Sequence, residues 1–296
     1  MHTNSNSQFK LFRVLHGRLL LFTILLSILL SILNFNTADS QESYSKGRRS
    51  IGQDFGDDCK IILDDGVSYY TLPFRFSGKD WLFTLGSAGA IGGLMTIDDD
   101  VKKSVVGDNV TETSVVWTVG KEYGNILYMG TGSVLFYATG LFTHEKEIRV
   151  TGRMLIQSLL YSGIASSGIK YITGRARPYV TNNQFDFTWL QTNNDYLSFP
   201  SGHTTVAFAV SSVLAERIDT WWARVFFYSL AAATGYSRIH DNQHWLSDVV
   251  LGGVIGFSSG FFTVHREIDR NKKRTGLSDN IDFSLSVRGL DFVYKF

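Results

Sequence analysis

The sequence has little of what a disulfide framework, a flexible linker or a nucleic-acid surface would need. Its one cysteine, Cys59, excludes an intrachain disulfide and a cysteine-rich zinc site. Three prolines against 28 glycines disfavour a proline-rich linker and suit helices that pack closely. The 28 basic and 27 acidic residues give a formal net charge of +1, without the basic excess of a nucleic-acid-binding protein. We therefore expect no nucleic-acid partner.

Charged residues are also scarce. They make up 19% of the chain, below the roughly 25% of a typical soluble domain. Apolar residues reach 44% and aromatic residues 14%, which excludes disorder for most of the chain. This composition is typical of a protein in or at a membrane or cell envelope.

The first forty residues follow the order of a secretory signal. Three basic residues precede a leucine-rich run over 19–35, and small polar residues follow up to Ser40. We therefore expect residues 1–40 to be a signal peptide, and the rest of the chain to be exported to the periplasm or cell envelope. The alternative is an N-terminal anchor, because about 17 apolar residues are at the short edge of a spanning helix.

The remaining chain divides into a polar extension over 41–79, a helical domain over 80–268 and a basic tail over 269–296. Gly, Ala and Ser interrupt the apolar segments of the domain, which predicts helices that approach closely. These segments cover about 81–97, 125–143, 152–169, 203–216, 222–236 and 246–264. We therefore predict an all-α fold, a bundle of about six core helices. Alternation in IDFSLSVRGLDFVYKF predicts a short C-terminal β-hairpin.

The distribution of basic residues conflicts with the predicted signal peptide on whether all of these segments cross a membrane. Clusters of Arg and Lys lie between the fourth and fifth segments and after the sixth, and the positive-inside tendency places both in the cytoplasm. Six crossings would then put residues 41–79 in the cytoplasm as well, whereas a secretory signal puts them outside. Three alternatives stay open: the bundle is water-soluble, one segment does not cross, or the N-terminal segment is not a secretory signal. We favour an envelope protein whose helices pack on each other.

Three short blocks carry side chains suited to chemistry. The first is KYITGRARP, residues 170–178, where Lys170 lies seven residues before Arg177 and Arg175 lies between them. Taken alone, this block is also consistent with a basic loop that closes the third segment.

The second block is FPSGHT, residues 199–204. Ser201 stands where a helix N-cap is expected, so the amides of Gly202 and His203 would point out of a helix N-terminus. Unpaired amides and the helix dipole favour an anion there, and Gly202 permits close approach to the backbone. An ordinary capped helix is the alternative, but His203 would place an imidazole beside any bound anion.

The third block is SRIHDNQHWLSD, residues 237–248. It contains Arg238, and Asp248 follows His244 by four residues, so on a helix the carboxylate can reach the imidazole and fix its tautomer. His240, His244 and Asp248 are also spaced as a metal-binding face. No further ligand cluster accompanies them, so we predict no metal site and a structural role for His240.

Together the blocks supply three cations, a helix-end anion site and two histidines, which suit phosphoryl transfer. Catalysis of that reaction is mostly positioning and stabilisation of negative charge on the transferred group. Arginine binds phosphate oxygens in pairs. One histidine can attack phosphorus while the other protonates the departing oxygen. Fixed cations neutralise the charge, so we expect no cofactor.

The same blocks resemble the signature of the phosphatidic acid phosphatase type 2 / vanadium haloperoxidase superfamily. That signature is Lys, six residues and Arg-Pro; then Pro-Ser-Gly-His; then Ser-Arg, five residues, His, three residues and Asp, and every fixed position is present here in order. The resemblance covers about 152–264. It implies an all-α bundle with its site at one end of the helices. The family includes soluble periplasmic acid phosphatases and membrane-embedded lipid phosphatases.

The resemblance also implies residue roles. His244 would be the nucleophile that forms a phosphohistidine, Asp248 would orient and polarise it, and His203 would be the general acid for the leaving group. The implied phosphate-binding residues are Lys170, Arg177, Ser201, Gly202 and Arg238.

The expected function is metal-independent hydrolysis of a phosphate monoester or pyrophosphate, either a lipid phosphate or a small periplasmic ester. Aromatic residues in the loop 179–198 would favour an acyl chain, or simply pack the loop down. A vanadate-dependent haloperoxidase and a non-catalytic envelope bundle are the alternatives. The second is disfavoured because every catalytic position is filled.

Overall fold

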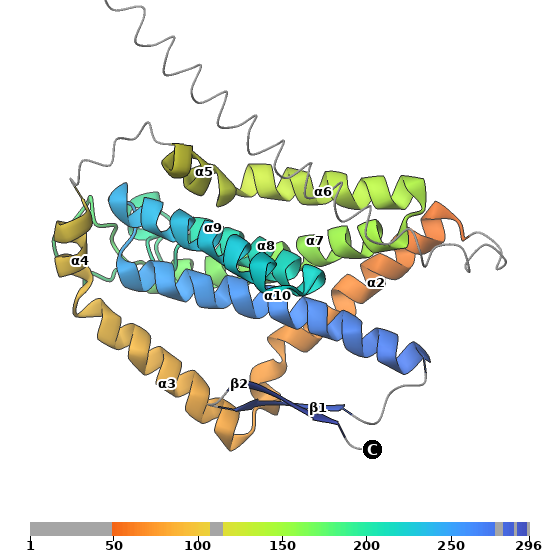
Figure 1. The fold of residues 1–296 in the computed structure, drawn as a ribbon. Coiled ribbons are helices and arrows are strands. Elements are labelled where there is room, and N and C mark those ends of the chain that lie inside the picture. Colours follow the sequence, from red (N-terminus) through yellow and green to blue (C-terminus); the bar gives the residue numbers. More distant parts are fainter. Residues whose placement is uncertain (1–48, 107–114, 276–280, 287–288, 295–296) are drawn as a thin grey trace, which may run out of the picture.

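The computed structural model describes residues 49–106, 115–275, 281–286 and 289–294. These residues form a bundle of helices followed by a β-hairpin (Figure 1). The all-α prediction is confirmed. The signal peptide predicted over 1–40 lies outside the described residues.

The described helices follow one another along the chain as α2 (Ile51–Tyr70), α3 (Gly78–Met95), α4 (Asp98–Val105), α5 (Val115–Tyr123), α6 (Ile126–Thr143), α7 (Lys146–Thr173), α8 (Gly202–Ile218), α9 (Trp221–His240) and α10 (Leu246–Thr275). Short 3₁₀ turns occur at η2 (Leu72–Arg75) and η3 (Asn194–Tyr196). Strands β1 (Ile281–Ser286) and β2 (Gly289–Tyr294) pair antiparallel, as the alternation at the end of the chain predicts.

Each of the six predicted apolar segments lies within or largely within one helix, namely α3, α6, α7, α8, α9 and α10. Several starts follow from local sequence. Ser50 and Gln53 form a capping box at α2, and Ser77 and Asp80 form another at α3. The Asn125 side chain caps α6 by accepting from a backbone amide.

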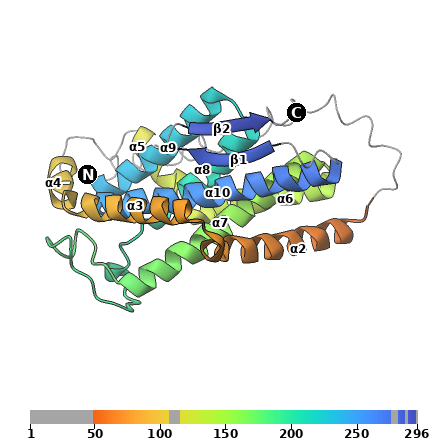
Figure 2. The same cartoon turned by 90° about the horizontal axis from the view of Figure 1, so that it is seen from below.

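The centre of the bundle is α8, which packs against α7, α9 and α10 (Figures 1 and 2). Small residues let α10 approach it closely. A Cβ placed on Gly256 of α10 would lie only 2.3 Å from the backbone oxygen of Thr205 on α8. The close helix packing predicted from the glycine content is therefore present where the two helices meet.

Buried ion pairs attach α2 to this bundle. Asp58 and Asp65 are 3% and 1% exposed. The Nε of Arg153 on α7 lies 3.2 Å from Asp58 Oδ1, and Nη2 of Arg270 on α10 lies 2.7 Å from Asp65 Oδ2. Arg153 also reaches Glu267 of α10 at 2.7 Å. The polar extension predicted over 41–79 thus contains a helix whose carboxylates pair with arginines of the bundle.

Two of the described helices are long and apolar enough to cross a membrane. They are α6, with 28% of its apolar window buried, and the Leu246–Lys273 portion of α10, with 56% buried. The remaining described helices do not meet the same measure of length and hydropathy. Among the described residues, less than a third of this window of α6 is therefore buried.

Candidate active site

The three sequence blocks meet at one end of the bundle, where α7 and α9 end and α8 and α10 begin. A cavity of about 380 Å³ opens there. Its lining residues are Lys170, Arg177, Asn194, Gly202, His203, Arg238, Gln243 and His244. Six of the eight predicted site residues are among them. The other two, Ser201 and Asp248, are fully buried behind the lining.

Lys170 lies in the last turn of α7, and its ammonium is turned toward the chain that leads into α8. Its Nζ donates to the backbone oxygen of Leu197 at 2.7 Å. Burial lowers the pKa of Lys170 to about 7, and the charge of Arg177 adds to this while that of Asp248 opposes it.

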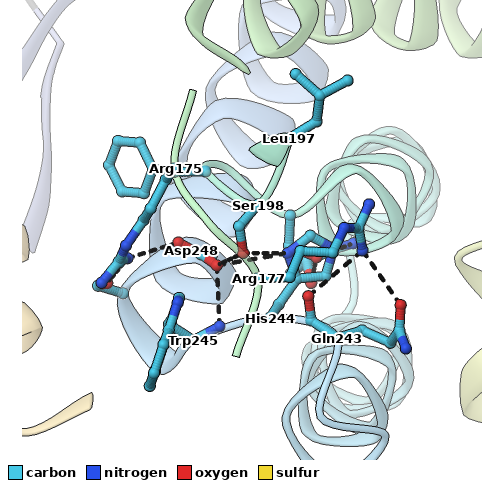
Figure 3. A network of polar contacts seen from close by, with 12 residues as sticks. Arg175, Arg177, Leu197, Ser198, Gln243, His244, Trp245 and Asp248 are labelled. Carbon is cyan, nitrogen blue, oxygen red and sulfur yellow. Dashed lines mark hydrogen bonds and ion pairs between the residues drawn. The ribbon is translucent and has the colours of Figure 1, made fainter. Parts of the chain in front are cut away.

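The guanidinium of Arg177 is held by neutral groups. Its Nε and Nη2 donate to the backbone and side-chain oxygens of Asn194 at 2.9 and 3.0 Å. Its Nη1 donates to the backbone oxygen of Gln243 at 3.4 Å and to its Oε1 at 3.3 Å (Figure 3). Because these partners carry no charge, the positive charge of Arg177 stays available to an anion. Asn194 and Gln243 were not predicted from the sequence, which shows no spacing signal for them.

Arg238, at the end of α9, differs in that it pairs with Asp241, three residues further on. Its Nε also donates to Ser237 Oγ at 3.3 Å. An anion in the cavity would therefore share this guanidinium with a carboxylate.

The start of α8 has the geometry predicted for an anion site. Ser201 is the N-cap, and its Oγ accepts from the amide of Thr204. Its own amide donates to the backbone oxygen of Asp248 at 2.9 Å, which ties the start of α8 to the start of α10. Gly202 and His203 follow as the first helical residues and line the cavity.

His203 is partly buried on the cavity wall. Burial, together with the charges of Arg238 and Arg177, lowers its pKa to about 4. This imidazole is therefore neutral at neutral pH unless an anion lies beside it.

His244 is 3% exposed and lies in the turn just before α10. Because α10 begins at Leu246, His244 and Asp248 do not share a helix, and the helical spacing considered for them does not apply. The two side chains still meet, with Nδ1 of His244 at 3.5 Å from Asp248 Oδ2. Burial lowers the pKa of His244 to about 3, although the hydrogen bond that its ring donates to Asp248 acts in the opposite direction. A neutral imidazole whose Nδ1 faces a carboxylate leaves Nε2 for the cavity.

The carboxylate of Asp248 is surrounded by donors (Figure 3). Its Oδ2 accepts from Ser198 Oγ and from the amide of Trp245 at 2.9 Å, and its Oδ1 accepts from Arg175 Nη1 at 2.6 Å. Arg175 is 0% exposed. The sequence placed it in a basic loop, and its burial beside Asp248 carries no local signal.

The described residues contain no group of three or more His, Cys, Asp or Glu side chains that could hold a metal ion. What the site offers is a polar cavity with three cations, a helix-end amide site and two neutral imidazoles. Such a cavity can bind a phosphate group and place a ring nitrogen near its phosphorus.

Comparison with known proteins gives a family and several relatives. Residues 152–272 match the family model described as the PAP2 superfamily. The chain is 34% identical over 125 residues to a lipid A 1-phosphatase of Porphyromonas gingivalis, covering 40% of this chain and 25% of that protein. It is 28% identical over 131 residues to an undecaprenyl-diphosphatase of Sulfolobus acidocaldarius, covering 44% of this chain and 61% of that protein.

Among solved structures, the crystal structure of Aquifex aeolicus LpxE is similar at 21% identity with a TM-score of 0.46, covering 57% of this chain and 95% of that chain. The chain spans between a quarter and about half of the length of the first curated relatives that it matches.

Proposed function

We propose that this protein is a metal-independent phosphatase, because residues 152–272 match the family model of the PAP2 superfamily. It hydrolyses a phosphate monoester or a pyrophosphate through a phosphohistidine intermediate. The observation that carries the proposal is the gathering of Lys170, Arg177 and Arg238 around one cavity that also contains the buried, neutral imidazole of His244. The negative charge of a bound phosphate group raises the pKa of Lys170 above its value of about 7, so that three cations surround the group. These cations match the charge of a transferred phosphoryl group, and a neutral ring nitrogen is a nucleophile.

The reaction begins with the phosphate group among these three cations and the amide of Gly202. The Nε2 of His244 attacks phosphorus, and the bond from phosphorus to the leaving oxygen breaks. His203 gives its proton to that oxygen. The proton on Nδ1 of His244 stays hydrogen-bonded to Asp248, which compensates the positive charge that the phosphorylated ring acquires. Water then attacks phosphorus, His203 takes the proton from it, and phosphate leaves with His244 restored.

A general acid has to carry a proton, whereas burial and the neighbouring cations keep His203 neutral at neutral pH. The bound substrate resolves this conflict. The same cations that lower the pKa of His203 are offset by the negative charge of a phosphate group. The pKa of His203 therefore rises on binding, and substrate itself brings the proton donor into its active state.

We propose a lipid phosphate as the substrate class, with the protein associated with a membrane of the cell envelope. The names of the relatives refer to lipid A and to undecaprenyl diphosphate, which are both lipids. The loop between the first two blocks, which contributes Asn194 to the cavity lining, exposes Phe185 and Trp189, at 51% and 67%. Exposed aromatic rings there suit an acyl or prenyl chain, and α6 presents further apolar surface.

The test is rapid acid quenching of the purified protein with a ³²P-labelled lipid phosphate. We expect a phosphoenzyme in the wild type and none in His244→Ala, whose turnover falls to background. His265→Ala is the control, because His265 lies on α10 away from the cavity-lining residues.

Turnover by His244→Ala at the wild-type rate would contradict the assignment of the nucleophile. Vanadate-dependent bromide oxidation by a wild type without phosphatase activity would favour the haloperoxidase alternative instead.

A further inference from the structure

A second layer of polar side chains lies behind His244 and Asp248. One member, Asp98, comes from the first residue of α4, outside the region that matches the family model. Asp98 is 0% exposed. Its Oδ1 accepts from the amide of Ser247 at 2.8 Å, and its Oδ2 accepts from Ser247 Oγ and from Arg175 Nη2 at 2.8 Å. A residue distant in sequence thus contacts the turn that carries His244.

Arg175 connects the two carboxylates. Its Nη1 donates to Asp248 at 2.6 Å while its Nη2 donates to Asp98, so one guanidinium bridges both (Figure 3 shows the Asp248 side). Its Nε and Nη2 also donate to the backbone oxygen of Gln184 at 3.0 and 2.6 Å. Three aromatic rings enclose the guanidinium at 5.4 to 5.8 Å, those of Phe187, Phe199 and Trp245. The side chain is therefore fixed in one orientation.

The charges of this layer do not cancel. Asp98 and Asp248 contribute two negative charges and Arg175 one positive charge, and all three residues are fully buried. The remaining negative charge faces the neutral ring of His244. When that ring takes a phosphoryl group it becomes positive, and a buried negative charge beside it lowers the energy of the phosphoenzyme.

We propose that Asp98 and Arg175 are positioning residues of the phosphatase reaction: they fix the carboxylate of Asp248 against His244 and supply the fixed charge that stabilises the phosphorylated imidazole. This inference rests on the proposed function and assigns part of its machinery to α4.

The neighbouring contacts of α4 support a role in holding the site together. Lys102 lies one turn after Asp98 on the same face of the helix. Its Nζ donates to the backbone oxygen of Pro178 at 2.6 Å and to Asn182 Oδ1 at 3.2 Å, and it lies 5.2 Å from the ring centre of Trp245. The short helix therefore contacts both the turn that carries His244 and the chain just after Arg177.

The two residues act on the site with different consequences. The titratable groups that face Asp248 are the neutral His244 and the basic Arg175, Lys170 and Arg177, with Asp98 reaching it through Arg175. Loss of the Arg175 charge leaves Asp248 buried beside fewer cations, so its carboxyl group takes up a proton at higher pH. Loss of the Asp98 charge leaves Asp248 ionised and removes only the compensation of the phosphorylated ring.

The experiment compares kcat, KM and pH profiles for Asp98→Asn, Arg175→Met and Arg175→Lys on a soluble aryl phosphate. We expect Asp98→Asn to lower kcat about 10- to 100-fold, as for outer partners of catalytic histidines at metal sites, with KM unchanged and no shift of the acidic limb. Arg175→Met should move the acidic limb of kcat up by about one to three pH units, and Arg175→Lys should move it back.

Asp100→Asn is the control, because Asp100 is an exposed neighbour on the same helix. We expect it to behave as wild type. If Arg175→Met does not fold, the inference is tested by the amount of phosphoenzyme that acid quenching traps in the Asp98→Asn variant. An amount equal to that of wild type would overturn the inference. So would an Asp98→Asn kcat within twofold of wild type, or a loss of kcat that only follows the loss of folded protein. A wild type without phosphoenzyme would instead contradict the proposed function.

Discussion

Two histidines at one cavity are both neutral for the same first reason, burial, yet their surroundings suit them to different work. His244 has a carboxylate at its Nδ1, whereas His203 has cations around it. An imidazole beside a carboxylate can carry a positive charge during the reaction. An imidazole among cations gains its proton only when an anion arrives.

This difference predicts how His203→Ala depends on the leaving group. We expect the rate on an alkyl phosphate to fall about 10²- to 10⁴-fold, the usual contribution of a general acid. The loss should be much smaller for an aryl phosphate, whose leaving oxygen needs no proton. Steady-state rates on a matched pair of substrates measure this. An equal loss on both would show that His203 acts in some other way.

At this scale the sequence predicted the cavity well. Conspicuous residue types at fixed spacing, such as Lys170 with Arg177 or Arg238 with His244, are among the six predicted residues that line it. It missed Arg175 and Asp98 because their function depends on partners far away in the chain. Asp98 lies in a run of three aspartates, and nothing local distinguishes the buried one from its exposed neighbour.

Among the helices, the contact of α8 with α10 decides how accurately the anion site is built. A Cβ on Gly252 would lie 2.5 Å from the backbone oxygen of Ser201, the N-cap of α8. A Cβ on Gly260, two turns further along α10, would lie 2.6 Å from Ser212 Cβ. The two glycines therefore face the same crowding, one at the site and one away from it.

We expect Gly252→Ala and Gly260→Ala each to lower the free energy of unfolding by about 1–3 kcal/mol, because overpacking forces the helices apart. The gain in helix propensity is the same for both and cancels in the comparison. Only Gly252→Ala should also lower kcat/KM strongly, because it displaces Ser201 and the amide of Gly202. Denaturant unfolding and kinetics on both variants check this, and equal activity losses would contradict it.

The helices that the sequence predicted are those with long apolar segments. Six helices were found because their apolar segments are long. The helices α2, α4 and α5 were not predicted. In the case of α4, the sequence DDDVKKSV shows no apolar periodicity that would indicate a helix. Its position is fixed by Asp98 and Lys102, which form hydrogen bonds with Arg175 and with the backbone of Pro178 near the site, and not by packing of apolar side chains.

For the molecule as a whole, the open question of the sequence was whether the bundle enters a membrane. On α6, Leu127, Leu135 and Phe142 are 72%, 60% and 68% exposed, more apolar surface than one soluble helix normally presents to water.

We therefore expect the expressed protein to remain in the membrane pellet after an alkaline carbonate wash, together with its phosphatase activity. Immunoblots of pellet and wash fractions measure the distribution. Complete release into the wash would argue for a peripheral or water-soluble protein and against access to lipid from within the bilayer.

The ion pairs beneath α2 set a limit on how far this protein can be shortened. Arg153 and Arg270 belong to α7 and α10, but the carboxylates of Asp58 and Asp65 that neutralise them come from the N-terminal extension. Without these carboxylates, Arg153 and Arg270 would share the one that remains, that of Glu267, and a buried charge that loses a partner costs about 3–5 kcal/mol, comparable to much of the stability of a small domain. Trimming the chain to residues 152–272, the part that matches the family model, would therefore leave a fragment with its reactive groups intact and its interior charge unbalanced.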